Sequence, residues 1–390
     1  MGKANLLNFN YKMKNILITG GAGFIGSNLA LRLISKGYTV TVLDNLSKQI
    51  HGDKPEESSP LYISIKNKVN FINGTVTSES DWVKAIEGQD AIVHLAAETG
   101  TGQSMYNIRN YVDTNIGGTA LMWEVLTNQK HSVKKLVVAA SRAIYGEGKY
   151  NCKDHGVVYP LCRLDDDMGN GDFNVKCPIC SKNVELLATT EDSAIHPTSV
   201  YGFTKQAQEE LSMITGKSLN IPVVAYRYQN VYGPGQSLSN PYTGILSIFS
   251  TRIKNGNDIS IFEDGEESRD FVYIDDIVEA TILGLEKDEA NFESFNVGTG
   301  VCTDVMTVAN TLVKYLDIPT KIEITGNYRL GDIRSNYADL SKINSLLGFV
   351  PTVSFDEGIS RFVNWVNQQE VQQDSYQQSI NELKERGLFK

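Results

Sequence analysis

The sequence lacks any apolar stretch approaching the ~20 residues that a helix needs to cross a membrane. Residues 1–14 also lack the apolar segment of a secretory signal peptide. Positive charge is scarce too: the 390 residues carry a net charge of −10, and no basic cluster is interleaved with aromatic residues. These absences argue against membrane insertion and nucleic-acid binding, and we expect a cytoplasmic protein. Residues 1–12 precede the first expected strand and are predicted to form a flexible extension.

A glycine turn near the start of the chain predicts a dinucleotide site. The β-branched run 15–19 is followed by Gly20, Gly23 and Gly26, then by a helix with apolar spacing and a second strand that ends at Asp44. This spacing lets the backbone approach a pyrophosphate at a helix N-terminus, where free N–H groups favour an anion. A carboxylate at the end of the second strand accepts hydrogen bonds from the adenine ribose and repels a 2′-phosphate. The pattern therefore favours NAD over NADP.

The same order of short apolar strand, loop and helix repeats through the first half of the chain. Such repetition predicts an α/β fold with a Rossmann-type, doubly wound parallel sheet. We expect an NAD-binding domain over 13–227 and a smaller C-terminal α/β substrate lobe over 228–390, interleaved with the sheet. The further strands are expected at 69–72, 91–95, 136–140 and 222–227, and the helices between them at 80–86, 112–126 and 199–214.

A tyrosine and a lysine four residues apart share one face of a helix, and the lysine ammonium is expected to lower the pKa of the phenol. This spacing occurs three times, at 62/66, 145/149 and 201/205. Only Tyr201 and Lys205 belong to a long expected helix that follows a strand ending in a serine, Ser141. We therefore predict that these three residues form the reactive group.

Together, the glycine turn, the strand end 94–97, the segment 141–146 and the Tyr201/Lys205 pair resemble the extended short-chain dehydrogenase/reductase family, in particular its nucleotide-sugar epimerases and dehydratases. The resemblance implies that Tyr201 is the general base, that Lys205 holds the nicotinamide ribose and that Ser141 bonds the reacting sugar oxygen. Where relatives carry an Asp-Val pair after the third strand, this chain has Thr75 and Val76, so the adenine contact is expected to be weaker or made by the backbone. The other cofactor-binding residues that it implies are Phe24, Ile25, Asn45, Leu95, Ala96, Ala97 and Asn115.

The resemblance also separates reaction types. In the dehydratases the matching serine is followed by an Asp-Glu pair, because elimination of water needs a further acid and base. Here Arg142 and Ala143 occupy those positions, which leaves epimerisation or simple reduction. A reductase commonly prefers NADPH, which Asp44 disfavours. By the same resemblance, the residues expected to contact a nucleotide-diphosphate sugar are Thr99, Ser141, Arg142, Asn230, Arg269, Arg329 and Asp332.

Four of the five cysteines lie in a single insert, residues 147–191. Cys177 and Cys180 have the spacing of a zinc knuckle, and Cys152 with His155 is the expected partner half; Cys162 is the alternative to His155. Four protein ligands would make the zinc structural, since no position is left to activate water. The alternative is a set of unrelated free cysteines.

Such a knuckle, together with segments 98–104 and 230–243, is similar to the dTDP-L-rhamnose 4-epimerase branch of the family. That similarity implies a tightly bound NAD and interconversion of dTDP-L-rhamnose and dTDP-6-deoxy-L-talose. A CDP-paratose 2-epimerase type, a UDP-sugar 4-epimerase type or an NDP-4-keto-sugar reductase are alternatives. A catalytically silent NAD-sensing scaffold would be expected to lack the tyrosine, lysine or serine. The family also implies a homodimer built on helices 112–126 and 199–214.

Overall fold

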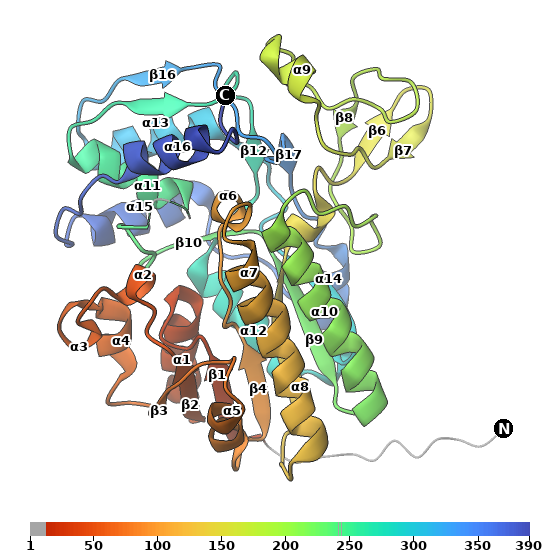
Figure 1. Ribbon diagram of the computed structural model, residues 1–390, viewed down its shortest axis with the longest axis vertical. Helices are drawn as coiled ribbons and strands as arrows, with labels where there is room; N and C mark the ends of the chain where they lie inside the picture. Colours follow the sequence, from red (N-terminus) through yellow and green to blue (C-terminus); the bar gives the residue numbers. More distant parts are fainter. Residues whose placement is uncertain (1–12, 241, 243) are drawn as a thin grey trace.

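A computed structural model describes residues 13–240, 242 and 244–390; the expected extension 1–12 and two positions of segment 230–243 lie outside the described residues. The central element is a seven-stranded parallel sheet with the strand order β14-β9-β5-β4-β1-β2-β3. Figure 1 shows this sheet with helices on both sides, which confirms the Rossmann-type fold. Its strands are β1 (Asn15–Thr19), β2 (Thr39–Asp44), β3 (Asn70–Asn73), β4 (Ala91–His94), β5 (Lys135–Ser141), β9 (Val223–Tyr228) and β14 (Glu293–Val297).

Alternate residues of the strands feed two hydrophobic cores. Ile16 and Ile18 of β1 face the core that contains α1 (Phe24–Ser35) and α12 (Ile274–Glu286), whereas Leu17 faces the core beneath α5 and α8. This alternation is the period of two expected for a strand buried on both faces. The helices of the second face are α5 (Glu79–Ile86), α8 (Gly118–Asn128) and α10 (Val200–Leu219).

Two helices differ from their expected bounds. The expected helix 112–126 begins as a π-helical segment, η1 (Val112–Gly117), and becomes α-helical only in α8. The expected helix 199–214 runs on to Leu219 and ends at Asn220, which has a left-handed conformation. Gly216 lets α10 lie close against Val223 of β9. A methyl group added at Gly216 would lie 2.3 Å from the Val223 side chain.

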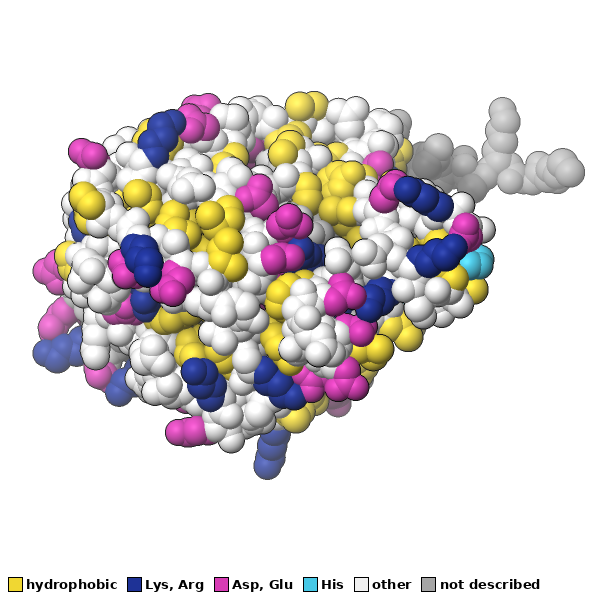
Figure 2. All heavy atoms as spheres, turned by 90° about the horizontal axis from the view of Figure 1, so that it is seen from above, with side chains coloured by type: hydrophobic (Ala, Val, Ile, Leu, Met, Phe, Trp, Pro, Cys, Tyr) yellow, Lys and Arg dark blue, Asp and Glu magenta, His cyan; other side chains and the backbone are white. Residues whose placement is uncertain are grey.

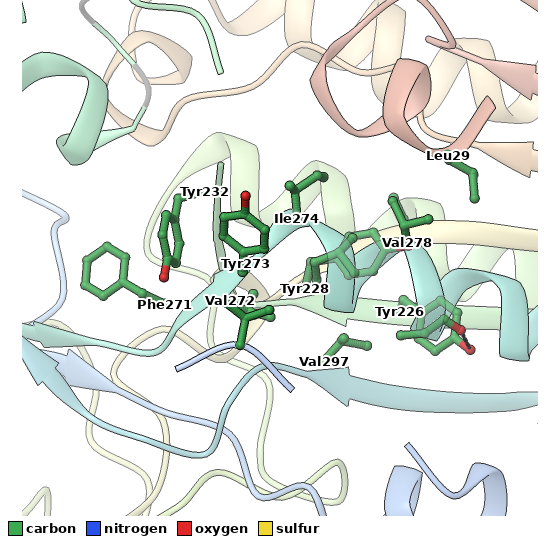
Figure 3. Close-up of a cluster of buried hydrophobic side chains, with 14 of the residues drawn as sticks. Leu29, Tyr226, Tyr228, Tyr232, Phe271, Val272, Tyr273, Ile274, Val278 and Val297 are labelled. Atoms are coloured by element: carbon green, nitrogen blue, oxygen red, sulfur yellow. Dashed lines mark hydrogen bonds between the residues drawn. The ribbon is translucent and has the colours of Figure 1, made fainter. Parts of the chain in front are cut away.

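The last strand and helix of the sheet layer come from the C-terminal half. β14 pairs with β9 in parallel, and α12 packs beside α1. The short strands β10 (Asn230–Tyr232) and β13 (Phe271–Tyr273) run between the sheet and the remaining C-terminal elements, and Figure 3 shows their aromatic side chains packed with Tyr228 and Ile274. Tyr232 and Tyr273 meet edge to face, with ring centroids 5.6 Å apart.

The smaller C-terminal lobe is built from helices around short paired strands, and it lies above the sheet in Figure 1. No helix of the described part of the chain is long and apolar enough to span a membrane. Acidic and basic side chains are interspersed on the face shown in Figure 2. The lobe comprises α11 (Ile245–Lys254), β11 (Ile259–Ile261), β12 (Ser268–Arg269), β15 (Thr303–Asp304), α13 (Val305–Leu316), β16 (Ile322–Ile324), β17 (Ser335–Asn336), α15 (Phe355–Val366) and α16 (Tyr376–Glu385). Two further elements, η3 (Asp288–Ala290) and α14 (Ser341–Leu347), lie instead beside the main sheet, where α14 packs against β14.

The insert forms a separate small unit at the upper right of Figure 1. β6 (Tyr150–Cys152) pairs antiparallel with both β7 (Gly156–Val158) and β8 (Glu185–Leu186), and α9 spans Asp165–Gly169. The other short elements lie at the carboxyl side of the sheet: α2 (Lys48–His51), α3 (Pro55–Ser58), α4 (Pro60–Ile65), α6 (Thr101–Ser104), α7 (Ile108–Tyr111) and η2 (Arg142–Tyr145).

Candidate active site

A cavity of about 520 Å³ opens at the carboxyl ends of the parallel strands, where ligands bind in sheets of this topology. It runs from the glycine turn to β10, so it joins the expected dinucleotide site to the expected substrate site. The predicted residues that line it are Gly20, Gly23, Phe24, Ile25, Gly26, Asp44, Asn45, Thr75, Val76, Leu95, Ala96, Ala97, Thr99, Ser141, Arg142, Tyr201, Lys205 and Asn230.

The glycine turn leaves no room for side chains. Gly20 has a φ of +66°, and a Cβ there would lie 2.8 Å from the main-chain nitrogen of Ala96. A Cβ at Gly26 would lie 2.4 Å from the carbonyl oxygen of Gly20. Gly23 caps the N-terminus of α1, whose first turn carries no acidic residue. The turn therefore presents unshielded N–H groups and the positive end of the helix dipole to the cavity.

Asp44 is fixed by its own backbone surroundings. Its two carboxylate oxygens accept hydrogen bonds from the main-chain N–H groups of Ala22 and Leu46, both at 2.9 Å. His51, which we did not predict, also lines the cavity, and its Nε2 lies 3.9 Å from Asp44 Oδ1. Burial lowers the pKa of His51, and the Asp44 charge only partly opposes this. A lone histidine after a strand gave no signal in the sequence for this contact.

Asn115 lies behind the cavity rather than in its lining. Its side chain is fully buried in η1, accepts from the N–H of Glu98 at 2.8 Å, and donates to the Glu98 carbonyl and the Thr204 hydroxyl. Asn115 belongs to the π-helical turn η1, and π-helical turns are frequent at functional sites. Asn115 therefore ties the Glu98 segment to α10, and its polar atoms are occupied by protein.

Tyr201, Lys205 and Ser141 converge on the cavity from α10 and the end of β5. Burial raises the pKa of Tyr201, while the hydrogen bond with Ser141 and the charge of Arg142 lower it; the net direction is upward. Our expectation that the lysine sets this pKa is wrong for the structure. Lys205 Nζ lies 6.0 Å from the Tyr201 ring centroid and donates to the carbonyl of Ala139 at 2.9 Å. Burial also lowers the pKa of Lys205 to about 7, which weakens it as a cation.

The other two tyrosines with the same spacing are engaged elsewhere. The Tyr62 hydroxyl donates to Glu56 at 3.2 Å. The Tyr145 hydroxyl is buried, donates to Asn296 and accepts from Arg227 at 2.7 Å. Neither tyrosine lines the cavity. Of the three tyrosines, Tyr201 is therefore the one that lines the cavity.

Two further residues at the reactive end were missed. Glu98 lines the cavity, and burial raises the pKa of its carboxyl group. Tyr111 packs edge-on against Tyr201, with ring centroids 6.5 Å apart, and its hydroxyl donates to the Gly100 carbonyl at 3.0 Å. These contacts join segments that are far apart in the sequence, so no local sequence pattern predicts them.

A cluster of arginines surrounds Asp332 beside the substrate end of the cavity. Burial alone would raise the pKa of Asp332, but the charges of four arginines hold it below its usual value. Of the four, Arg142 lines the cavity, where its Nε donates to Asn230 at 2.8 Å. The four are Arg142, Arg163, Arg269 and Arg329.

The lining of the cavity does not include three residues that we expected to contact substrate directly: Arg269, Arg329 and Asp332. Arg269 Nη2 pairs with Asp332 Oδ1 at 3.0 Å, and its guanidinium also donates to the carbonyls of Ile333 and Arg334. The guanidinium of Arg329 lies over the ring of Phe262, at 4.8 Å from its centroid. Arg269 is buried, so it is not a surface ion pair.

The insert brings its four predicted ligands together. The ligand atoms of Cys152, His155, Cys177 and Cys180 all lie within 4.8 Å of one another. Cys152 Sγ is 3.5 Å from His155 Nδ1 and 3.7 Å from Cys180 Sγ. Cys162 is exposed and lies outside this group, so the geometry favours His155 as the fourth ligand. Three sulfurs and an imidazole are a donor set suited to zinc.

The chain is similar in sequence to known proteins. The model of the NAD dependent epimerase/dehydratase family matches residues 16–160 and 181–298. The dTDP-L-rhamnose 4-epimerase of Burkholderia thailandensis is 34% identical over 361 residues, which cover 91% of this chain and 96% of that protein. The unmatched residues 161–180 fall within the insert.

Solved structures give the same result. The UDP-glucose 4-epimerase of Thermotoga maritima, determined with UDP-glucose, superposes with a TM-score of 0.73 at 29% identity, over 91% of this chain and 99% of that one. The UDP-glucuronic acid 4-epimerase of Bacillus cereus, in complex with UDP-glucuronic acid and NAD, also has a TM-score of 0.73, at 26% identity and with the same coverage.

The chain therefore belongs to the NAD dependent epimerase/dehydratase family, within the extended short-chain dehydrogenases/reductases. Its class of enzyme is that of the NAD-dependent sugar epimerases, as its motifs led us to expect.

Proposed function

We propose that this enzyme is a nucleotide-sugar 4-epimerase that acts through a transient 4-keto sugar and interconverts dTDP-L-rhamnose and dTDP-6-deoxy-L-talose. One observation carries the reaction type: Ser141, Tyr201 and Lys205 line the same cavity as the glycine turn and Asp44. The choice of sugar is supported by the similarity to the Burkholderia enzyme.

NAD fits the first half of the cavity. The glycine turn would hold its pyrophosphate, Asp44 its adenine ribose and Lys205 its nicotinamide ribose. When bound, NAD supplies reversible hydride acceptance at the sugar carbon. A tightly held cofactor suits an epimerase, because the oxidised and reduced forms alternate within one turnover.

In this proposal Tyr201 removes the proton from the C4 hydroxyl and Ser141 completes the hydrogen bonds to that oxygen, which is supported by their position in one cavity and by the Tyr201–Ser141 hydrogen bond. Because burial raises the pKa of Tyr201, the phenolate needs a cation. Arg142 opposes the effect of burial in the structure, because its charge lowers the pKa of Tyr201. On return of hydride to the other face of the ketone, the same tyrosine gives the proton back.

Epimerisation requires that the sugar turn over while its diphosphate stays in place. Arg142, Arg163, Arg269 and Arg329 surround the carboxylate of Asp332 beside the substrate end of the cavity. Glu147 also lies among these arginines, so the cluster is a mixed network of charges. The diphosphate of a nucleotide sugar carries about two negative charges, and Arg142, which lines the cavity, would supply it with a bidentate cation. Arg142 and Asn230, which both line the cavity, would make the direct contacts.

We further propose a structural zinc ion on the Cys152, His155, Cys177 and Cys180 cluster, and a homodimer. The dimer is supported by large apolar side chains that are more than half exposed on α7 and α10. These side chains are Ile108, Phe203 and Ile214.

Incubation with dTDP-L-rhamnose in deuterated buffer, without added cofactor, tests the main proposal. Proton NMR should show the C4 epimer without deuterium at C4, because hydride returns from bound NAD rather than from solvent. Absence of conversion would contradict the choice of sugar, and the same assay with CDP-, UDP- and GDP-sugars would then identify the substrate. Turnover that required added NADPH would support a reductase instead.

A further inference from the structure

The segment 328–334, here called the arginine loop, contains Arg329 and Asp332 of the arginine cluster. It also touches the helix that carries the reactive tyrosine. Thr198 donates its hydroxyl hydrogen to the carbonyl of Gly331 at 2.9 Å, and Ser199, the next residue, caps α10 two residues before Tyr201. The position of the arginine loop therefore affects both the charge beside the cavity and the start of α10.

The insert contacts the arginine loop at three points. The main-chain N–H of Arg334 donates to Glu147 Oε2 at 2.8 Å, and the other two contacts involve Tyr328 and Arg163. Tyr328 packs in a small core with Met168 and Phe173, and its hydroxyl donates to Asp165 Oδ1 at 2.7 Å. Arg163 donates from Nη2 to the carbonyl of Asp332 at 3.2 Å. In all three contacts the partner of the arginine loop is a residue of the insert.

Arg163 is held rigidly, which makes it suitable for positioning a loop. Its side chain is only 2% exposed, and it pairs with both oxygens of Glu263, at 2.7 and 2.8 Å. Its Nε lies 3.2 Å from Glu147, where the insert begins. Moving Arg163 would remove an ion pair from two buried carboxylates, of which Glu263 alone has a second guanidinium partner among these arginines, that of Arg334, at 3.0 Å.

The metal cluster is continuous with this contact. Val175 and Cys177 belong to the small core around the cluster, whereas Phe173, two residues earlier, packs against Tyr328 of the arginine loop. The rings of Phe173 and Tyr328 have centroids 6.3 Å apart. The short segment 173–177 therefore links the expected metal ligands to the arginine loop.

We propose that the metal-binding insert positions the arginine loop for substrate binding, and that Arg163 and Tyr328 are the positioning residues through which it acts. The assignment of the substrate as a nucleotide diphosphate rests on the proposed function. Loosening the insert is expected to weaken nucleotide-diphosphate binding and raise KM, with a smaller effect on kcat and no loss of bound NAD.

The test compares full-length Arg163→Met, Arg163→Lys and Tyr328→Phe with the native enzyme. Hydrogen exchange of residues 326–336 is measured without substrate, and the Kd for dTDP is measured by calorimetry. We expect faster exchange of the arginine loop and a roughly tenfold weaker Kd for Arg163→Met and Tyr328→Phe, with partial recovery in Arg163→Lys. Treatment of native enzyme with a zinc chelator should have the same two effects.

Asp172→Asn is the matched control, because Asp172 pairs with Lys176 on the surface of the insert and is not among the contacts to the arginine loop. Native exchange and native dTDP affinity in folded Arg163→Met and Tyr328→Phe would overturn the proposal. If Arg163→Met does not fold, Tyr328→Phe decides alone, since it removes one hydroxyl. The hydrogen-exchange measurement is made without substrate, so its outcome does not depend on which sugar the enzyme converts. A failure of the proposed function would therefore be distinguished from a failure of this proposal.

Discussion

Tyr111 packs edge-on against Tyr201, but the two hydroxyl groups have different partners. The Tyr111 hydroxyl donates to the backbone of the loop after β4, whereas the Tyr201 hydroxyl forms a hydrogen bond with Ser141 in the cavity. The phenol proposed as the base is thus set between an aromatic wall and one hydrogen-bonding partner. Four predictions follow from this site and its surroundings.

Tyr201→Phe should reduce epimerase activity by roughly 10³-fold or more, because it removes the proposed proton acceptor and leaves the ring in place. The measurement is kcat with dTDP-L-rhamnose, together with the absorbance of copurified NAD. Tyr62→Phe is the matched control: it belongs to a pair with the same spacing, but its hydroxyl contacts Glu56 outside the cavity. Equal losses in the two variants would contradict the assignment.

Asp44→Ser should weaken NAD binding by about 1–3 kcal/mol, since the ribose loses a charged acceptor, and should improve NADP binding relative to NAD. The ratio of the two Kd values, measured on cofactor-stripped protein, tests this. The substitution also removes the carboxylate that holds the N–H groups of Ala22 and Leu46. A ratio that stays at the native value would mean that another group selects the cofactor.

His94→Gln should reduce the acid sensitivity of folding. His94 is buried between Thr19 and Thr119, and burial lowers its pKa to about 3. In the unfolded chain the imidazole of His94 binds a proton as the pH falls through about 6.5, whereas in the folded protein it stays neutral until about pH 3. The contribution of neutral His94 to the free energy of unfolding is therefore fully present above pH 6.5 and is lost as the pH falls towards 3. The loss between pH 6.5 and 5 is about 2 kcal/mol. Urea unfolding at both pH values measures this loss of stability. If His94→Gln lost as much stability as the native protein, His94 would not be the cause of the acid sensitivity.

Cys180→Ser should lower the zinc content from one ion per chain and reduce Tm by roughly 5 °C, because the insert loses one of four ligands. Elemental analysis and thermal unfolding are the measurements. Cys302→Ser is the control, since Cys302 lies outside the cluster and donates only to Ser268. Equal zinc content in native protein and Cys180→Ser would exclude the site.

The parts of the site that could be predicted from the sequence are those that a short segment defines. The glycine turn, the strand after it and Asp44 lie within 30 residues, and each has a fixed backbone role. Tyr201 could be chosen over two competitors because a long helix is visible in the pattern. The ligands of the proposed metal cluster were likewise found from the spacing of Cys177 and Cys180.

What was missed depends on burial and on distant contacts. The effect of Lys205 on Tyr201 was misjudged because spacing on a helix says nothing about desolvation, which here dominates the pKa of both groups. His51 and Tyr111 reach the site through loop conformations that no periodic pattern encodes. Arg329 was expected to contact substrate, yet its packing over Phe262 is set by the tertiary structure.

The pairing of β14 with β9 also has a consequence for biosynthesis. The sheet that holds the dinucleotide site acquires its last strand only at residues 293–297, about three quarters of the way along the chain. While the ribosome is still adding those residues, the apolar edge of β9 has no partner on that side. During synthesis the edge of β9 therefore stays unpaired until the seventh strand has been made, unless another protein covers it. A fragment that ends at residue 227 would keep this edge unpaired.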